Sequence, residues 1–179
     1  ITPRGGRRVD LVGLAGQDTP PARRVSGLAE IDRVLGGGLV PGSAVLIGGD
    51  PGIGKSTLLL QVVARLSNGG GCAYISGEEA VDQVRMRAVR LGVSAAPVAL
   101  AASTNVRDIL ATLDAPDGPS VVVIDSIQTM YVDSLDSAPG TVAQVRASAQ
   151  ELIRLAKKRG IALLLVCLLY TSDAADDQA

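Results

Sequence analysis

One segment, residues 49–56, constrains the fold of this chain more than any other. It reads GDPGIGKS and matches the pattern GxxxxGK[ST] of a phosphate-binding loop, the P-loop. The motif follows a short apolar run at residues 44–47 and precedes residues 56–66, which are apolar on nearly all sides. A buried strand, a tight turn and an enclosed helix form the context that a P-loop requires. The sequence therefore predicts these three elements in this order.

The residues of this loop have distinct chemical roles in binding a nucleotide. Glycines allow backbone N–H groups to turn toward phosphate oxygens, and the start of the following helix attracts the same anion. Lys55 places a full positive charge on the β and γ phosphates, and the Ser56 hydroxyl is a ligand for Mg²⁺. The predicted nucleotide-binding residues are Gly49, Asp50, Pro51, Gly52, Ile53, Gly54, Lys55, Ser56 and Thr57.

A second motif ends in an acidic residue, Asp125, 70 residues after Lys55. Residues 121–124 read VVVI, the pattern of a buried strand, and Asp125 follows directly. In a parallel sheet this carboxylate emerges at the strand end beside the P-loop, which is the Walker B arrangement for holding Mg²⁺ through water. Many strands end in Asp as a turn residue, so the P-loop upstream is what favours the metal-binding interpretation.

Glu78 and Glu79 follow another predicted strand, residues 72–75. The carboxyl ends of neighbouring parallel strands open onto one crevice, so a carboxylate here can orient and activate the attacking water. The chain contains no His, which excludes an imidazole base and leaves this role to a carboxylate. The alternative is that both acids lie in the first turn of the next helix, where its dipole favours them. Glu79 fits that alternative well, whereas we assign the catalytic role to Glu78.

The rest of the chain alternates between strand and helix patterns. Further strands are predicted at residues 98–101 and 161–166. Further helices are predicted at residues 81–91, 106–113 and from about Val142 onward. Arg85, Arg87 and Arg90 lie off the apolar stripe of one of these helices. Apolar strands that alternate with helices indicate a parallel sheet covered on both faces. The predicted fold class is therefore α/β, with a mostly parallel sheet and helices on both faces.

The charged residues are unevenly distributed. The formal net charge is −1, but residues 1–24 hold five Arg against two Asp. We expect a basic flexible linker there, either as a solvated segment or as an arm that touches phosphates. A second basic cluster, KKR at residues 157–159, is explained either by nucleic-acid binding or by the dipole of a helix that ends at Gly160.

The composition excludes several classes of site. Aromatic residues make up only 2% of the chain, so platforms for base stacking are scarce. Cys72 and Cys167 cannot form a four-ligand zinc site without His. No apolar core of a signal peptide and no run of 18 apolar residues is present. We therefore expect a soluble, cytoplasmic protein with no membrane partner.

Beyond these motifs, the chain resembles a known family. Residues 25–43 are similar to the segment that leads into the P-loop of RecA-like ATPases. The segments YISGEEA, VVVIDSIQTM and DSAPGTVAQVRASAQELIRLAKKRGIALLLV resemble the bacterial RadA (Sms) family of RecA-related DNA repair and recombination ATPases. The resemblance covers residues 25–166 and implies that they form a RecA-like P-loop ATPase core.

This resemblance implies more than the motifs do alone. It implies an Mg²⁺-dependent ATPase with Lys55 and Glu78 as catalytic residues, and with Ser56 and Asp125 as the Mg²⁺ site. Members of the family form homo-hexamers that bind ATP between subunits and act on single-stranded DNA and branched intermediates. The expected cofactors are therefore ATP and Mg²⁺, and the expected partners are single-stranded DNA and recombinase filaments.

The sequence also departs from the family pattern. It lacks the four-Cys zinc motif, and residues 131–141, where a first DNA-facing loop is expected, contain no Lys or Arg. The acidic segment at residues 167–179 stands where the family has its second DNA-facing loop, and we interpret it as a non-native tail on a truncated core. Without the basic residues of the missing part, the chain is expected to bind ATP better than it hydrolyses ATP.

Two other functions stay open at this point. A signalling ATPase or kinase of the KaiC type has a similar glycine-rich lead-in and P-loop, and hydrolysis stimulated by DNA would distinguish the two classes. The other function is a nucleotide-binding scaffold without turnover, which ATP binding without phosphate release would favour.

Overall fold

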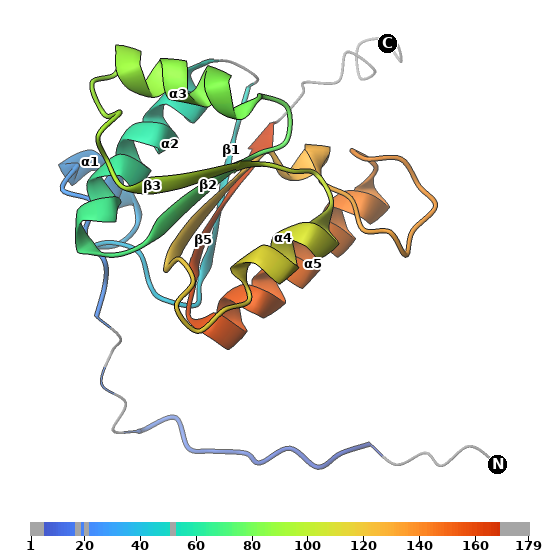
Figure 1. The fold of residues 1–179 in the computed structure, drawn as a ribbon. Helices are drawn as coiled ribbons and strands as arrows, with labels where there is room; N and C mark the ends of the chain where they lie inside the picture. Colours follow the sequence, from blue (N-terminus) through green and yellow to red (C-terminus); the bar gives the residue numbers. More distant parts are fainter. Residues whose placement is uncertain (1–5, 17–18, 20–21, 51–52, 169–179) are drawn as a thin grey trace, which may run out of the picture.

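Five parallel strands form one sheet in the computed structural model, which describes residues 6–16, 19, 22–50 and 53–168. The strands lie side by side in the order β1 (Ala44–Gly49), β5 (Ala162–Leu168), β4 (Val121–Asp125), β2 (Cys72–Ser76) and β3 (Val98–Ala102) (Figure 1). Every pairing between neighbours is parallel. The predicted parallel sheet of an α/β fold is confirmed.

Helices cover both faces of the sheet, as predicted. One face carries α1 (Ala29–Val34), α2 (Ile53–Leu66) and α3 (Val81–Arg90), and the other carries α4 (Val106–Leu113) and α5 (Val142–Arg159) (Figure 1). Two short 3₁₀ turns lie at Ser67–Gly69 and Ile127–Thr129. Among the helices described, none combines the length and the apolar character needed to cross a membrane.

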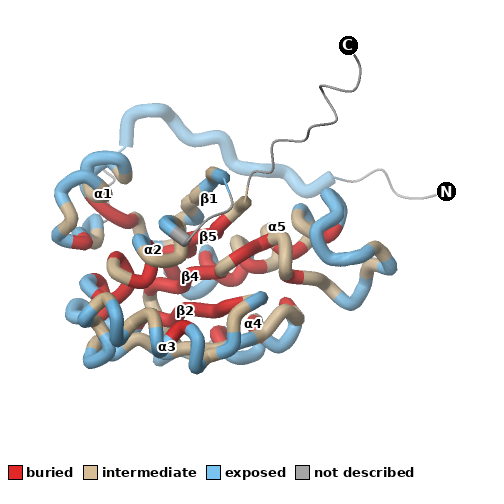
Figure 2. Tube along the Cα trace, turned by 90° about the horizontal axis from the view of Figure 1, so that it is seen from above, coloured by how far each residue is buried: buried red, intermediate tan, exposed pale blue. Residues whose placement is uncertain are grey.

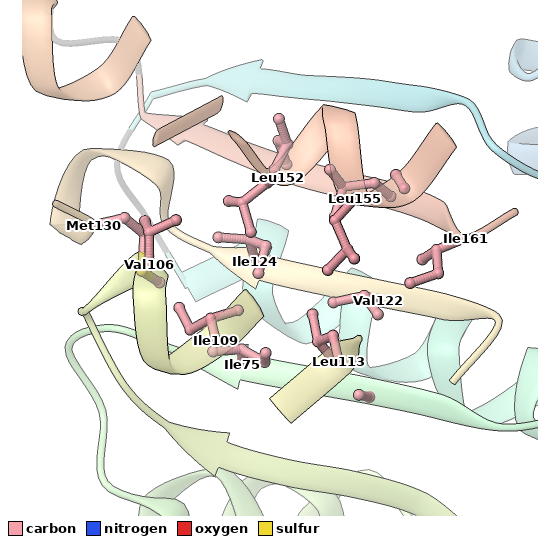
Figure 3. Packing of buried hydrophobic residues seen from close by; sticks show 14 of the residues in the cluster. Ile75, Val106, Ile109, Leu113, Val122, Ile124, Met130, Leu152, Leu155 and Ile161 are labelled. Carbon is pink, nitrogen blue, oxygen red and sulfur yellow. The ribbon is translucent and has the colours of Figure 1, made fainter. Parts of the chain in front are cut away.

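The two faces of the sheet bury separate apolar clusters, because side chains alternate in direction along each strand. Val122 and Ile124 of β4 face α4 and α5, where Ile109 belongs to the same cluster (Figure 3). Val121 and Val123 face α2 and α3. These four side chains of β4 are all 0% exposed, so β4 is the buried centre of the sheet (Figure 2).

β1 is an edge strand, and among the described residues it pairs only with β5. Its residues alternate between exposed and half-buried, and Leu46 is 65% exposed. The strand that leads into the P-loop is therefore held by one neighbour, whereas β4 is held by two.

β5 ends at Leu168, two residues beyond the predicted strand end, so it includes the first two residues of the predicted tail, 167–179. Cys167 and Leu168 continue the ladder with the last two residues of β1. The Gln128 amide also binds the strand end, since Nε2 donates to the Leu168 carbonyl at 2.7 Å and Oε1 accepts from the Leu168 N–H at 3.2 Å. The rest of the predicted tail, residues 169–179, lies outside the described residues.

Arg24, the last residue of the predicted linker at residues 1–24, is bound to the folded domain. It forms two backbone hydrogen bonds with Leu39, at 2.7 and 2.8 Å. Its guanidinium donates to the Leu66 carbonyl at 2.6 Å and to Ser120 Oγ. The last carbonyls of a helix have no partner within the helix, so Arg24 satisfies one of them at the end of α2.

The residues before Arg24 differ in their contacts. Arg23 donates from its guanidinium to the Leu35 carbonyl at 3.2 Å and to the Gly38 carbonyl at 3.3 Å. Residues 6–16 are exposed and form neither helix nor strand, and in Figure 1 they run away from the sheet. The last two arginines of the predicted linker thus bind the domain through backbone carbonyls.

The basic cluster at the end of α5 binds the turn that follows α4. Lys158 Nζ and Arg159 Nε lie 3.1 and 2.6 Å from the two carboxylate oxygens of Asp114. The hydrogen bond from Arg159, followed by that from Lys158, lowers the pKa of the Asp114 carboxyl. Gly160 ends the helix in a left-handed conformation with φ of 68°. Structural contacts therefore account for two of the three cations, which favours the structural explanation over nucleic-acid binding.

We expect Arg24→Ala to lower the free energy of unfolding by about 1–3 kcal/mol, because the Leu66 carbonyl and the Ser120 hydroxyl lose their donor. Urea unfolding followed by circular dichroism measures this difference. Arg8→Ala is the matched control, since Arg8 is exposed and makes no hydrogen bond in the described part of the chain. Equal unfolding free energies for the two variants would show that Arg24 does not stabilise the domain.

Candidate nucleotide-binding site

The P-loop connects the end of β1 to the start of α2. β1 ends at Gly49, and α2 begins at Ile53, earlier than the predicted helix. Residues 54–57 therefore lie at the start of α2, and its first turn contains no acidic residue. The free N–H groups and the positive end of the helix dipole attract an anion at this point. Two of the predicted binding residues, Pro51 and Gly52, lie outside the described residues.

Lys55 lies across the loop. Its Nζ donates a hydrogen bond to the carbonyl of Asp50. A Cβ atom at Gly49 would overlap Cε and Nζ of Lys55, and Gly49 has a φ of 155° that disfavours other residues. Gly49 is therefore needed for the ammonium group to lie over the loop, which is where the phosphates are expected.

Asp125 is bound by two hydroxyl groups that come from other elements. Ser56 Oγ, on α2, donates to Asp125 Oδ2 at 2.6 Å, and the Tyr74 hydroxyl, on β2, donates to the same oxygen. Asp125 lies on the face of β4 that contacts α2, since alternation gives its side chain the direction of Val121 and Val123. The structure thus brings the predicted Mg²⁺ ligands Ser56 and Asp125 together.

Tyr74 is a site residue that the sequence analysis missed. It is 0% exposed, and burial, followed by the negative charge of Asp125, raises its pKa far above the usual range of a phenol. The hydroxyl is therefore neutral and donates to the carboxylate. Strand parity was the signal that could have found it, because Tyr74 lies opposite Val123 and so shares its sheet face with Asp125.

Ser56 and Asp125 fit an Mg²⁺ site by their chemistry. Hydroxyl and carboxylate oxygens are hard ligands, and Mg²⁺ is usually bound by one or two carboxylates together with phosphate oxygens and water. The described residues contain no group of three or more His, Cys, Asp or Glu side chains that could hold a metal ion. A metal ion at Ser56 and Asp125 would therefore depend on the nucleotide for part of its coordination.

Glu78 and Glu79 lie in the turn between β2 and α3. Ser76, the last residue of β2, is opposite Asp125 in the parallel register. The Gly77 N–H donates to the Asp125 carbonyl at 2.8 Å, and the Glu79 N–H donates to Ser76 Oγ at 3.0 Å. The turn is therefore bound to the end of β4, at the edge of the sheet where the P-loop also lies.

The two acids of this turn have different surroundings. Glu78 is exposed and makes no hydrogen bond through its side chain among the described residues. Glu79 forms an ion pair with Arg87 of α3. Because α3 begins at Val81 and has Ala80 as its N-cap, neither acid lies in the first turn of that helix. The helix-dipole explanation is therefore wrong for both acids.

Gly77 is needed in this turn because the space beside it is filled. A Cβ atom at Gly77 would overlap the side chain of Thr129. Thr129 lies in the 3₁₀ turn after β4, where its Oγ1 donates to the Ser126 carbonyl at 2.7 Å. The segments that follow β2 and β4 are therefore in direct contact, which the sequence pattern alone did not reveal.

The predicted DNA-facing segment, residues 131–141, is held by Gln144 of α5. The Gln144 side chain is buried, and its Oε1 accepts from the Val132 N–H at 2.9 Å while its Nε2 donates to carbonyls of the same segment. Asp133 forms an ion pair with Arg107 of α4 at 3.0 Å. The segment itself contains no Lys or Arg, and one of its two carboxylates is paired with a cation of α4.

Comparison with known proteins identifies sequence relatives of this chain. A family model described as AAA domain matches residues 15–167. The DNA repair protein RadA of Brucella abortus is 58% identical over 171 residues, which cover 93% of this chain and 37% of the relative. RadA of Pseudomonas aeruginosa is 52% identical over 162 residues, which cover 90% of this chain and 36% of the relative. The chain thus spans little more than a third of the length of these curated relatives.

Solved structures share the fold at lower sequence identity. The RadB recombinase superimposes with a TM-score of 0.59 and 23% identity, over 83% of this chain and 72% of that chain. A DnaB-like replicative helicase superimposes with a TM-score of 0.70 and 16% identity, over 88% of this chain and 47% of that chain. At such identities the common feature is the fold, and the predicted RecA-like fold class is confirmed.

We expect Lys55→Ala to weaken the binding of MgADP by about tenfold to a hundredfold, as the loss of one charge-assisted contact of about 1.5–3 kcal/mol implies. Titration calorimetry measures the affinity, and the thermal midpoint should stay unchanged because Lys55 bonds only a loop carbonyl. Lys157→Ala is the control, since it removes the same charge from an exposed position on α5. Unchanged MgADP affinity in Lys55→Ala would contradict the assignment of the loop.

Proposed function

This chain belongs to the AAA-domain family, and we propose that it is the ATP-binding and ATP-hydrolysing core of a RadA-like DNA repair ATPase. The observation that carries the proposal is the hydrogen bond from Ser56 Oγ to Asp125 Oδ2 at 2.6 Å. It joins the start of the P-loop helix to the carboxylate at the end of β4. P-loop ATPases build their Mg²⁺–nucleotide site from these two groups.

Each polar group of the site has a role in transferring the γ-phosphoryl group to water. Lys55 binds the β and γ phosphates and offsets the charge that develops on them. Ser56 and Asp125 would hold Mg²⁺, which when bound neutralises the phosphate oxygens. The neutral hydroxyl of Tyr74 orients the Asp125 carboxylate. Glu78 orients the attacking water and accepts its proton.

This chain spans 37% of the length of its Brucella relative, so action on DNA and assembly are proposed as properties of the whole protein. We propose action on single-stranded DNA and branched intermediates, in the cytoplasm, as a homo-hexamer that works with recombinase filaments. The name of the relatives, DNA repair protein, supports this class of substrate. Residues 131–141 offer no cation to DNA phosphates, so the main phosphate contacts are expected elsewhere.

Two measurements separate this proposal from its alternatives. Stimulation of hydrolysis by single-stranded DNA in the full-length protein distinguishes a DNA repair ATPase from a signalling ATPase or kinase of the KaiC type. ATP binding with no release of phosphate, with or without DNA, would instead favour a nucleotide-binding scaffold without turnover.

We expect Glu78→Gln to keep ATP affinity and to slow hydrolysis by at least about tenfold to a hundredfold. This is the scale of acid–base assistance by one side chain. Glu79→Gln should slow hydrolysis less, because the Glu79 carboxylate is paired with Arg87 and is not free to accept the proton of the water. Single-turnover phosphate release and titration with a non-hydrolysable ATP analogue measure the two effects separately. If Glu79→Gln were the more damaging change, the assignment of Glu78 as the base would be wrong.

A further inference from the structure

The ion pair between Arg87 and Glu79 differs from the other ion pairs of the described residues in its burial. The Arg87 side chain is only 12% exposed and that of Glu79 is 30% exposed. The Arg85–Asp82 pair of the same helix is 69% and 87% exposed. Exposed pairs contribute little to stability, whereas breaking a buried pair leaves an uncompensated charge. Arg87 is therefore firmly bound to Glu79.

This pair connects α3 to the turn that carries Glu78. Arg87 lies in α3, and its Nη2 donates to Glu79 Oε2 in the turn that precedes the helix. The N–H groups of Gly77 and Glu79 hold the turn at the end of the sheet, since they donate to the Asp125 carbonyl at 2.8 Å and to Ser76 Oγ at 3.0 Å. Glu78 lies between Gly77 and Glu79, and its side chain is exposed and forms no hydrogen bond or ion pair among the described residues. Its position therefore depends on the two residues beside it.

The Arg87 guanidinium also lies within electrostatic reach of the Asp125 carboxylate. The hydrogen bond with Glu79 raises the pKa of Arg87, burial lowers it, and the charges of Glu79 and Asp125 raise it further. Its second nitrogen, Nη1, is buried and has no hydrogen-bond partner among the described residues. Burying a cation in this way costs desolvation energy that an apolar side chain of the same shape would not. A role in packing alone does not explain the charge.

We propose that Arg87 is a positioning residue of the ATPase site, which holds Glu79 and thereby fixes the turn that presents Glu78 to the attacking water. This inference rests on the proposed ATPase function. Arg87 touches neither the nucleotide nor the water, and it acts on the reaction through Glu79. In metal sites, removing a group that orients a ligand typically changes activity by tenfold to a hundredfold. Arg87 orients a catalytic side chain in the same indirect way.

The test compares four variants of the whole chain, and a fifth as a control, with the parent. Arg87→Gln removes the charge, Arg87→Lys keeps it, and Glu79→Gln removes the partner alone or together with Arg87→Gln. Arg85→Gln is the matched control, because it removes the same charge from an exposed position on the same helix. The measurements are single-turnover ATP hydrolysis, MgADP affinity, and amide hydrogen exchange of residues 77–80 by mass spectrometry.

We expect Arg87→Gln to slow hydrolysis about tenfold while MgADP affinity changes by less than about twofold. Exchange in the turn should become faster, because the side-chain bond that holds Glu79 is lost. Arg87→Lys should recover part of the rate. The double variant should be no slower than Arg87→Gln alone, since both changes remove the same ion pair.

The proposal is wrong if Arg87→Gln matches the Arg85→Gln control in both hydrolysis and exchange. It is also wrong if MgADP affinity falls as far as the rate does, because Arg87 would then act on nucleotide binding. If Arg87→Gln does not fold, Glu79→Gln, which breaks the same ion pair from its other side, decides by the same criteria. If the parent chain does not hydrolyse ATP, the proposed function fails for this chain, and the exchange of residues 77–80 alone decides whether Arg87 holds the turn.

Discussion

The pairing of β4 with a neighbour on each side is the constraint on which the site depends. Parallel register brings Ser76, Asp125 and Val166 to one level at the same end of the sheet. The P-loop strand β1 is not adjacent to β4, because β5 lies between them. Helix α2 closes this gap, since it leaves β1 and contacts both β4 and β2. The crossing of α2 over β5 therefore brings Ser56 to Asp125.

Buried polar side chains then fix the groups that surround this contact. Tyr74 binds Asp125 from β2, and Gln144 binds the segment after β4 from α5. Both side chains are buried, where a hydrogen bond is strong and an unpaired group is costly. The Asp125 carboxylate and the segment after β4 are therefore held in place by buried hydrogen bonds.

The parts of this site that the sequence predicted are those that local patterns encode. A glycine-rich loop between a strand and a helix, and an acid after four apolar residues, can be recognised without a structure. Arg87 could not be distinguished from Arg85 in this way, because both lie off the apolar stripe of α3. Arg85 is exposed, whereas Arg87 turns back to Glu79, and only the position of the preceding turn decides this. Arg24 was missed for the same reason, since its partners lie on distant segments.

Among the described residues, β1 has a neighbour on one side only, and this has a consequence for the behaviour of the chain in solution. An unpaired edge presents a row of N–H and C=O groups to any other strand, and proteins commonly protect such edges with charged residues, proline or a bulge. β1 reads AVLIGG and contains neither charge nor proline, and the Leu46 side chain is exposed along it. Edge-to-edge association of two copies would add a strand directly beside the P-loop. An edge-to-edge contact of this kind would therefore couple self-association of the chain to nucleotide access at the P-loop.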